Sequence, residues 1–432
     1  MRHFDRRAFL KNTLAAAAAP YVLSASALGA AGRPAPSNRI GIGVIGTGGQ
    51  GGWHVKGLLE EADVQILATC DVNAGRRENH KRAVEARYAA EKASGAYKGC
   101  DSYGDFRDVL ARKDIDAVLI AVPDHWHSLI SVMAAKAGKD IYCEKPMAAT
   151  IAEGCAAADA AKRFGRIFQT GSQERSGRAR LGCELVRNGR IGRLHTIRTH
   201  LPVDSYTQGP APAMPVPPGF DYDTWLGPAP WEPYTERRCH FNFRWILDYS
   251  DGELTDRGCH VNDIALWGAG PLVEGPIEVE GKGRFRDDTL WNVPIEFHIE
   301  YTCANGLRII TESSGQRGIR FEGTDGWIFV AIHGGDLSAE PATILRSTIG
   351  PNEVHLPYSN NHRRNWLDAI KTRGETVAPA EAGHRTASFC HVGLIAMLLG
   401  RKVKWDLKRE QFLGDAEANR MIARPMRSPW HL

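Results

Sequence analysis

The sequence predicts an α/β protein with a parallel sheet in its N-terminal part and a largely antiparallel sheet in its C-terminal part. Apolar strand-like segments alternate with helical patterns between residues 39 and 170, which is typical of a parallel sheet covered by helices on both faces. Beyond Gly192 the pattern changes to alternating apolar and polar residues, which predicts strands with one solvated face. A chain of 432 residues also exceeds what one hydrophobic core usually serves, so two domains are expected.

Five strands are expected in the N-terminal part, with helices between them. They lie near residues 39–45, 64–70, 117–122, 140–143 and 166–170. The carboxyl ends of parallel strands meet at one edge of a sheet, and ligands bind in the crevice outside that edge. Residues that directly follow these strands are therefore the first candidates for a binding site.

The first expected strand runs into a glycine-rich turn that matches the pattern G-x-G-x-x-G, Gly46-Thr47-Gly48-Gly49-Gln50-Gly51. The first glycine of this pattern allows a tight turn, the second lets the backbone approach a pyrophosphate, and the third lets the next helix pack closely. The first N–H groups of that helix then face the anion. The turn therefore predicts a dinucleotide-binding Rossmann domain.

The second expected strand ends in Asp71, twenty residues after Gly51. A carboxylate there can accept hydrogen bonds from both hydroxyls of an adenosine ribose and would repel a 2′-phosphate, which favours NAD over NADP. Arg76 and Arg77 follow closely and could instead hold a 2′-phosphate.

The composition describes an ordinary soluble globular protein, with 43% hydrophobic and 24% charged residues. The formal charge of the chain is +4. The first thirty residues hold four cationic residues and one acidic residue, Asp5, and so supply +3, which leaves +1 for the rest of the chain. No basic stripe with interleaved aromatic residues is left to suggest nucleic-acid binding.

The N-terminus resembles a twin-arginine export signal. Arg6-Arg7 precedes an alanine-rich apolar stretch over residues 14–28, which includes the small-residue site Ala25-Ser26-Ala27. The stretch is too short for a confident membrane-spanning helix. We therefore expect a periplasmic or secreted protein without stable membrane insertion.

The nine cysteines include no C-x-x-C pair and are odd in number, so neither a disulfide framework nor a zinc site is expected. His125 and His127 have a spacing that could suggest a metal, yet no third ligand is nearby in the sequence. A packed or hydrogen-bonded pair is the expectation for these histidines, and no metal site is predicted.

Two strand ends carry unusual chemistry. Pro123 to His127 follows the third of these five strands, and Glu144-Lys145-Pro146 follows the next. Proline after Lys145 favours an extended conformation, which points the lysine toward the cofactor cleft; the alternative is a surface lysine beside a turn.

Nine prolines fall between Pro202 and Pro233, which excludes a central strand or helix and predicts a long ordered loop. Such loops inside compact domains are often functional.

Farther on, Asp256, His260 and Asp263 have the spacing i, i+4, i+7, which would place them on one helix face. A carboxylate beside an imidazole raises its basicity, as a general base needs, although a lone helical histidine is often structural.

Residues 277–346 alternate as strands of the second sheet, and helical patterns follow over 362–371 and 381–399. The last residues are basic and aromatic with little periodicity, which predicts an extended arm that packs on a neighbouring subunit. The expected segments are a leader at 1–30, a linker at 31–38, a Rossmann domain at 39–190, a substrate and oligomerisation domain at 191–400, and an arm at 401–432.

These signatures occur in the order found in the Gfo/Idh/MocA oxidoreductases, which the chain resembles over roughly residues 39–400. The resemblance implies a Rossmann domain followed by an α/β domain with an open-faced antiparallel sheet, a nicotinamide cofactor, a sugar or cyclitol substrate, and a homo-oligomer (dimer or tetramer). It implies that Lys145 polarises the substrate hydroxyl, that His260 takes its proton, and that Asp256 orients the histidine or binds a neighbouring hydroxyl.

The resemblance also gives the candidate binding residues. Cofactor contacts are expected from Gly46, Thr47, Gly48, Gly49, Gln50, Gly51, Asp71, Pro123, His127, Glu144, Lys145 and Gln173. Weaker candidates for substrate contacts are Asp263, Arg244 and His240.

Two other functions stay open. The first is redox-neutral elimination or cleavage of a glycoside through transient oxidation, although a galactosaminidase branch of the family lacks the lysine that Lys145 supplies here. The second is a non-catalytic dinucleotide or sugar sensor, which would be expected to lose Lys145 or His260.

Because an exported enzyme would meet little free dinucleotide, tight binding of nearly one NAD(H) per chain is expected.

Overall fold

The computed structural model describes residues 34–35, 38–203, 209–286, 290–333 and 336–432. The expected export signal over residues 1–30 lies outside this part of the chain. Within it, no helix is both long enough and apolar enough to cross a membrane.

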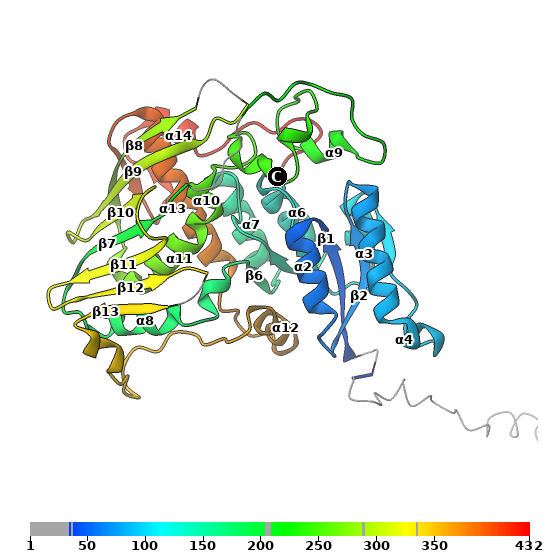
Figure 1. The fold of residues 1–432 in the computed structure, drawn as a ribbon, viewed down its shortest axis with the longest axis horizontal. Helices are drawn as coiled ribbons and strands as arrows, with labels where there is room; N and C mark the ends of the chain where they lie inside the picture. The colour runs from blue at the N-terminus through cyan, green and yellow to red at the C-terminus, as the bar shows by residue number, and fades with distance from the viewer. Residues whose placement is uncertain (1–33, 36–37, 204–208, 287–289, 334–335) are drawn as a thin grey trace, which may run out of the picture.

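The N-terminal part forms a six-stranded parallel sheet with the order β3-β2-β1-β4-β5-β6, which confirms the predicted Rossmann arrangement (Figure 1). The strands are β1 (Ile40–Ile45), β2 (Val64–Cys70), β3 (Asp101–Tyr103), β4 (Ala117–Ile120), β5 (Asp140–Cys143) and β6 (Phe168–Thr170). The strand β3 was not predicted, because three partly exposed residues are too short to give an apolar pattern. The strand order reverses between β1 and β4, where a crevice opens at their carboxyl ends.

Helices accompany these strands on both faces of the sheet. They are α2 (Gly49–Leu58), α3 (Ala74–Arg87), α4 (Ala89–Ala93), α5 (Phe106–Ala111), α6 (Asp124–Lys136) and α7 (Ile151–Arg163). The first strand is buried along its whole length, as expected for a strand covered on both faces.

The C-terminal part forms a nine-stranded sheet with the order β13-β12-β11-β7-β10-β9-β8-β14-β15. Only β7 and β10 pair in parallel, so the predicted largely antiparallel sheet is confirmed. The strands are β7 (Leu194–His200), β8 (Pro276–Phe285), β9 (Pro294–Cys303), β10 (Arg308–Glu312), β11 (Gly318–Gly323), β12 (Trp327–Ala331), β13 (Leu337–Glu340), β14 (Val403–Asp406) and β15 (Gln411–Phe412).

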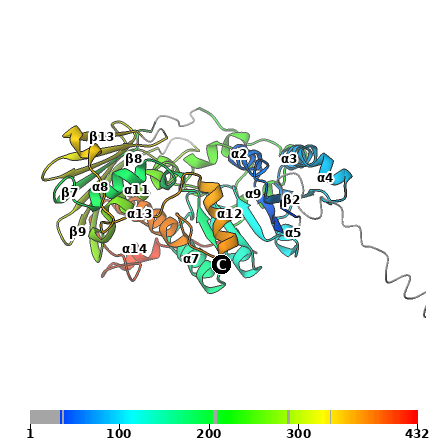
Figure 2. The same ribbon diagram turned by 90° about the horizontal axis from the view of Figure 1, so that it is seen from below.

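One face of this sheet packs against α8 (Ala179–Arg187), α11 (Gly258–Ala269) and α13 (Ala380–Leu399). Of these, α11 and α13 lie on the side of the sheet that faces the Rossmann part (Figures 1 and 2). Along β9, Phe297 and Ile299 are buried on that face, whereas Glu296 and His298 are exposed on the other. The polar outer face is the open face that the alternating pattern predicts.

Short helices connect these elements. They are η2 (Gln173–Arg175), α9 (Tyr222–Leu226), η3 (Glu236–Arg238), η4 (Asn242–Trp245), α10 (Glu253–Asp256), η5 (Gly270–Leu272), η6 (Ala342–Arg346), α12 (His362–Thr372) and α14 (Ala416–Arg420).

The described residues of the proline-rich segment form an ordered connection, as predicted, and its aromatic residues share an apolar cluster with Trp245, Tyr249 and Trp291. It docks on the end of β2, where the Asp221 N–H donates to the Val72 carbonyl at 3.0 Å and the Ala74 N–H donates to the Gly219 carbonyl at 2.8 Å. The segment therefore covers the carboxyl edge of the Rossmann sheet beside α3.

The C-terminal segment packs on its own chain, and the expected contact with a neighbouring subunit stays a prediction. First, β14 and β15 extend the nine-stranded sheet. The chain then returns to the Rossmann part, where the Trp430 ring lies 4.7 Å from that of Trp126, edge to face, and Arg427 pairs with Asp223 at 2.6 Å. The C-terminal Trp430 therefore packs against an aromatic residue of the same molecule.

Candidate active site

A cavity of about 860 Å³ lies at the carboxyl ends of the Rossmann strands. Its walls include the glycine turn after β1, the ends of β4 and β5 at Pro123 and Lys145, the proline-rich segment at Phe220, and the α10–α11 region at His260. The cavity thus joins the expected cofactor cleft to the expected catalytic residues.

The glycine turn has the geometry of a pyrophosphate cradle. Gly46 has a φ of +85°, and a Cβ there would lie 2.3 Å from the Ala121 carbonyl oxygen. At Gly51, a Cβ would lie 1.9 Å from the Gly46 carbonyl oxygen. The helix α2 begins at Gly49 without a side-chain cap on its first N–H groups. These groups are therefore available to an anion at the helix N-terminus, so a dinucleotide fits this turn.

Asp71 lies at the end of β2 and lines the same cavity. Its Oδ2 accepts hydrogen bonds from the Thr47 backbone N–H at 2.8 Å and from the Thr47 hydroxyl at 3.2 Å, and its Oδ1 accepts one from the Asn73 N–H at 2.8 Å. These bonds fix the carboxylate beside the glycine turn, where a ribose hydroxyl could reach it.

Glu144 is buried at the centre of a hydrogen-bond network. Its Oε1 accepts from Gln50 at 2.8 Å and Gln173 at 2.9 Å, and it lies 2.7 Å from His54 Nε2. Burial alone would raise the pKa of Glu144, but the bond to His54 and the charge of Lys145 hold that pKa well below its usual range. The carboxylate is thus a fixed negative charge next to Lys145.

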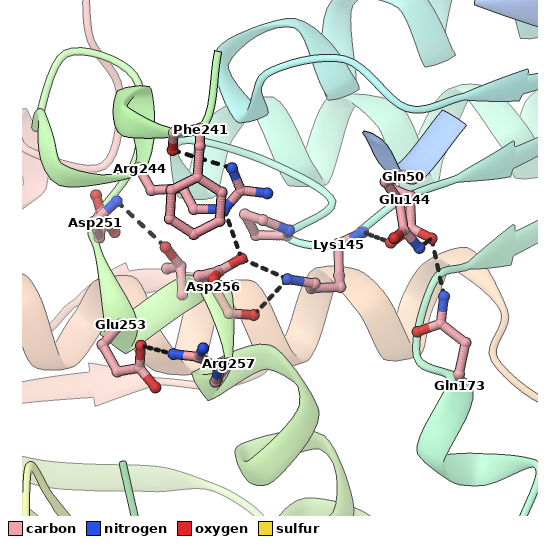
Figure 3. Close-up of polar contacts among 12 residues, drawn as sticks. Gln50, Glu144, Lys145, Gln173, Phe241, Arg244, Asp251, Glu253, Asp256 and Arg257 are labelled. Carbon is pink, nitrogen blue, oxygen red and sulfur yellow. Dashed lines mark hydrogen bonds and ion pairs between the residues drawn. The ribbon is translucent and has the colours of Figure 1, made fainter. Parts of the chain in front are cut away.

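Lys145 and Asp256 form a buried ion pair across the cavity (Figure 3). The lysine Nζ donates to Asp256 Oδ1 at 2.6 Å and to the Asp256 backbone carbonyl at 2.8 Å, while Arg244 Nε donates to the same Oδ1 at 3.2 Å. Burial opposes both charges, yet Asp256 raises the pKa of Lys145, and the two cations hold the pKa of Asp256 well below its usual range. Lys145 is therefore a cation at neutral pH.

His260 lines the cavity from α11 and is only 6% exposed. Its Nδ1 has no hydrogen-bond partner, and its ring lies edge to face with His333 at 5.4 Å. Burial, together with the charge of Lys145, lowers the pKa of His260 to about 3. The imidazole is therefore neutral at physiological pH and can accept a proton.

Two models of one oxidoreductase family match the chain. The model of the family's NAD-binding Rossmann fold covers residues 40–172, and the model of its C-terminal α/β domain covers residues 206–432. The chain belongs to the Gfo/Idh/MocA oxidoreductase family.

Curated members of this family share part or most of the sequence. A myo-inositol 2-dehydrogenase from Thermotoga maritima is 30% identical over 385 residues, which cover 86% of this chain and 97% of the relative. A glycosyl hydrolase family 109 protein from Shewanella baltica is 32% identical over 211 residues, so the chain matches only 45% of that relative's length.

Solved structures share the fold. A levoglucosan dehydrogenase in complex with NADH and L-sorbose aligns with 86% of this chain and 99% of its own, with a TM-score of 0.60 at 20% identity. An aldose-aldose oxidoreductase from Caulobacter crescentus aligns with 85% and 99%, with a TM-score of 0.61 at 19% identity.

The predicted helix with Asp256, His260 and Asp263 on one face is wrong for this Gfo/Idh/MocA protein. The helix α10 ends at Asp256 and α11 begins at Gly258, so the Asp256 carboxylate turns to Lys145 and not to His260. Asp263 does not line the cavity; both its oxygens accept from Arg175 at 2.7 Å, and it is 1% exposed. Its expected substrate contact is therefore corrected to a structural ion pair.

His240 also differs from expectation. It lines the cavity, but its Nδ1 lies 2.9 Å from Arg76 Nη2, close to Asp71 and the glycine turn. This places it at the dinucleotide end and not beside Lys145, where a polyol contact was expected. The contact also holds the Arg76 guanidinium beside the η3–η4 connection.

The two histidines after β4 are packed and hydrogen-bonded to backbone carbonyls, as expected. His125 Nε2 lies 3.0 Å from the Trp225 carbonyl oxygen, and His127 Nδ1 lies 2.6 Å from that of Pro146. Both bonds tie α6 to other walls of the cavity, to which Pro123 and His127 also contribute.

Asp124 is a cavity residue that the sequence analysis did not single out. It is 5% exposed, its Oδ2 has no hydrogen-bond partner, and burial raises its pKa to about 7. Its position directly after Pro123, at the carboxyl end of a Rossmann strand, was the available signal. Trp53 and Phe241, each 54% exposed, also line the cavity and carried no signal beyond their residue type.

Proposed function

We propose that this protein oxidises a hydroxyl group of a sugar or cyclitol to a carbonyl group and keeps its NAD(H) bound between turnovers, and that a second substrate takes the hydride from the bound NADH to restore NAD. The observation that carries the proposal is that a cation and a neutral imidazole line the same cavity as the glycine turn that fits a dinucleotide. Lys145 is cationic, whereas the His260 imidazole is neutral. A cation and a proton acceptor are the two groups that an alcohol needs in order to lose a proton. The 30% identity to a myo-inositol 2-dehydrogenase supports the substrate class.

Each residue then has a distinct task. The Lys145 ammonium binds the reacting hydroxyl oxygen and stabilises its developing negative charge. Asp256 holds the ammonium in place, and the His260 imidazole accepts the hydroxyl proton. The nicotinamide cofactor, when bound, supplies the hydride acceptor. Gly46 to Gly51 would hold its pyrophosphate.

We propose NAD as the preferred cofactor, because the Asp71 carboxylate is fixed at the ribose end of the cavity and would repel a 2′-phosphate. Arg76 is the residue that could hold such a phosphate, and its contact with His240 competes with that role. Dissociation constants for NAD and NADP, measured on cofactor-free protein, test the preference; tighter NADP binding would refute it.

We further propose export by the twin-arginine route into the periplasm or medium, on the sequence of residues 1–30 alone. Retention of the cofactor fits that route, because a dissociated dinucleotide would be lost by dilution. Phe220 and Trp225 of the proline-rich segment line the cleft, as does His240 farther along the chain. We also expect a dimer or tetramer, which light scattering measures.

The decisive experiment is to purify exported protein without added cofactor, denature it and quantify the released dinucleotide. We expect close to one NAD(H) per chain. Protein that emerges empty and needs millimolar added NAD would defeat the retention proposal. Incubation of the same protein with a panel of sugars and cyclitols, followed by the absorbance of NADH at 340 nm, tests the oxidation itself.

Redox-neutral cleavage of a glycoside is the second candidate, and the family 109 glycosyl hydrolase relative favours it. In that case the hydride would return to the same substrate after cleavage. Analysis of the products over a panel of glycosides distinguishes the two functions, since only one yields an oxidised sugar. A non-catalytic sensor would bind these ligands and give neither product.

A further inference from the structure

A second cluster of chemically active side chains lies outside the active-site cavity, where three elements meet. Cys155 comes from α7, His384 from α13, and Glu410 from the turn between β14 and β15. One potential ligand atom from each lies within 4.8 Å of the other two. Within the described ranges, these are the residues whose donor atoms converge in this way, and none of them lines the active-site cavity.

The backbone is shaped to bring the three side chains together. A Cβ at residue 154 would lie 2.6 Å from His384 Nδ1, so Gly154 is what lets the imidazole approach α7. Glu410 has a φ of +52°, a left-handed conformation that is uncommon for a residue with a side chain. Its N–H donates to the Asp406 carbonyl at 2.8 Å, which closes the turn and presents the carboxylate to the histidine.

The surroundings supply a supporting shell. His384 Nε2 lies 2.5 Å from Glu410 Oε1, while its Nδ1 lies 3.3 Å from the Ser388 hydroxyl, so the second ring nitrogen has an orienting partner. The Asp159 Oδ2 lies 3.8 Å from the Cys155 sulfur, one turn farther along α7. Asp159 thus lies next to Cys155, and a turn of its side chain toward His384 and Glu410 would add a second carboxylate oxygen to the site.

We propose that Cys155, His384 and Glu410 bind a zinc-class divalent cation, with Asp159 as the fourth ligand. One sulfur, one imidazole nitrogen and two carboxylate oxygens suit Zn²⁺, whereas Ca²⁺ and Mg²⁺ prefer sites made of oxygen alone. His384 is 2% exposed, Cys155 and Glu410 are half-buried, and Asp159 is exposed, so the ion would be shielded by protein on all sides except that of Asp159. Because the ligands come from three elements, the ion would clamp the C-terminal β14–β15 turn to the last helix of the Rossmann part.

Cobalt titration tests the site with a readout independent of catalysis. Tag-free protein is stripped with a chelator and titrated with Co²⁺, which gives a near-ultraviolet thiolate-to-metal band when a cysteine ligates it. We expect one Co²⁺ per chain, displacement by Zn²⁺, and a melting temperature that rises with metal concentration. Protein that shows no band and no thermal shift would hold only a hydrogen-bonded histidine and carboxylate, which would overturn the proposal.

Variants assign the ligands. Cys155→Ser should abolish the band, and His384→Ala should weaken binding by more than about tenfold. Asp159→Asn, at an exposed residue, tests the fourth ligand with little risk to folding. The controls are Glu381→Gln, an exposed carboxylate on the same helix, and His355→Ala, an exposed histidine elsewhere; both should bind cobalt as the parent does. An unchanged band in Cys155→Ser would come from another thiol and would refute this ligand set.

Discussion

Lys145 is the side chain on which the proposed oxidation depends most. Its ammonium is held at 2.6 Å from Asp256, whereas the dinucleotide cradle lies on the glycine turn. We expect Lys145→Ala to lower kcat by about 10² to 10⁴-fold, because the lost charge acts on the reacting oxygen. The dinucleotide released on denaturation should stay near one per chain. Lys136→Ala, an exposed lysine on α6, is the matched control, and a near-parental rate for Lys145→Ala would contradict the assignment.

His260 is expected to act as the proton acceptor, so the effect of its removal on the reaction rate should depend on pH. We expect His260→Ala to turn over about 10² to 10⁴-fold more slowly at pH 7 and to recover partly at high pH, where the substrate hydroxyl ionises more readily. Added imidazole should restore part of the rate. Activity that is unchanged at every pH would make His260 a structural residue.

Asp124 makes the stability of the fold depend on pH. Its pKa is raised from 3.8 to about 7, because burial disfavours the charged form. The folded chain therefore holds one more proton than the unfolded chain between these values. The stabilisation is complete below pH 4 and is lost as the pH rises through 7.

Urea denaturation of the parent and of Asp124→Asn at several pH values measures this effect. The free energy of unfolding of the parent, relative to the variant, should fall between pH 4 and pH 7 and level off above it. Two curves that stay parallel over this range would show that Asp124 does not titrate there.

At the scale of elements, the proline-rich segment is expected to retain the cofactor. Phe220 is 8% exposed, lines the cavity, and lies 5.8 Å from the His240 ring by centroids. We expect Phe220→Ala to release NADH at least about tenfold faster, because the proline-rich segment then loses the side chain with which it lines the cavity. Stopped-flow fluorescence of bound NADH measures the release. Trp231→Ala, on the same segment but 63% exposed, should leave it unchanged.

The C-terminal tail should contribute to the stability of the Rossmann part. The Trp430 ring packs on Trp126 and Phe106, and Arg107 lies 5.4 Å from its centroid. We expect Trp430→Ala to lower the free energy of unfolding by ~1–2 kcal/mol, since a half-buried aromatic contact is lost. Urea denaturation measures the change. A tail that instead serves a neighbouring subunit would give a loss that depends on protein concentration.

At the scale of the whole molecule, the sequence predicted what depends on local patterns. Buried parallel strands give continuous apolar runs, so the expected bounds 64–70 and 140–143 match β2 and β5. The strand ends also led to Lys145 and the Pro123 segment, because the topology of a parallel sheet brings its carboxyl ends together.

What the sequence could not predict depends on packing between distant elements. The spacing of Asp256, His260 and Asp263 does not show that a break at Arg257 separates two helices. Nor does it show that Asp263 forms an ion pair with Arg175. The charge state of Asp124 and the destination of Trp430 likewise follow only from burial and contact in the folded chain.

The return of the chain to its first half has a consequence for biosynthesis. Trp366 and Leu367 of α12 belong to the same apolar cluster as Ile42 and Val44 of β1, and Trp430 closes on α6. A nascent chain that ends before these residues therefore lacks part of the N-terminal core. The packing of that core is complete only once Trp366, Leu367 and Trp430 have left the ribosome.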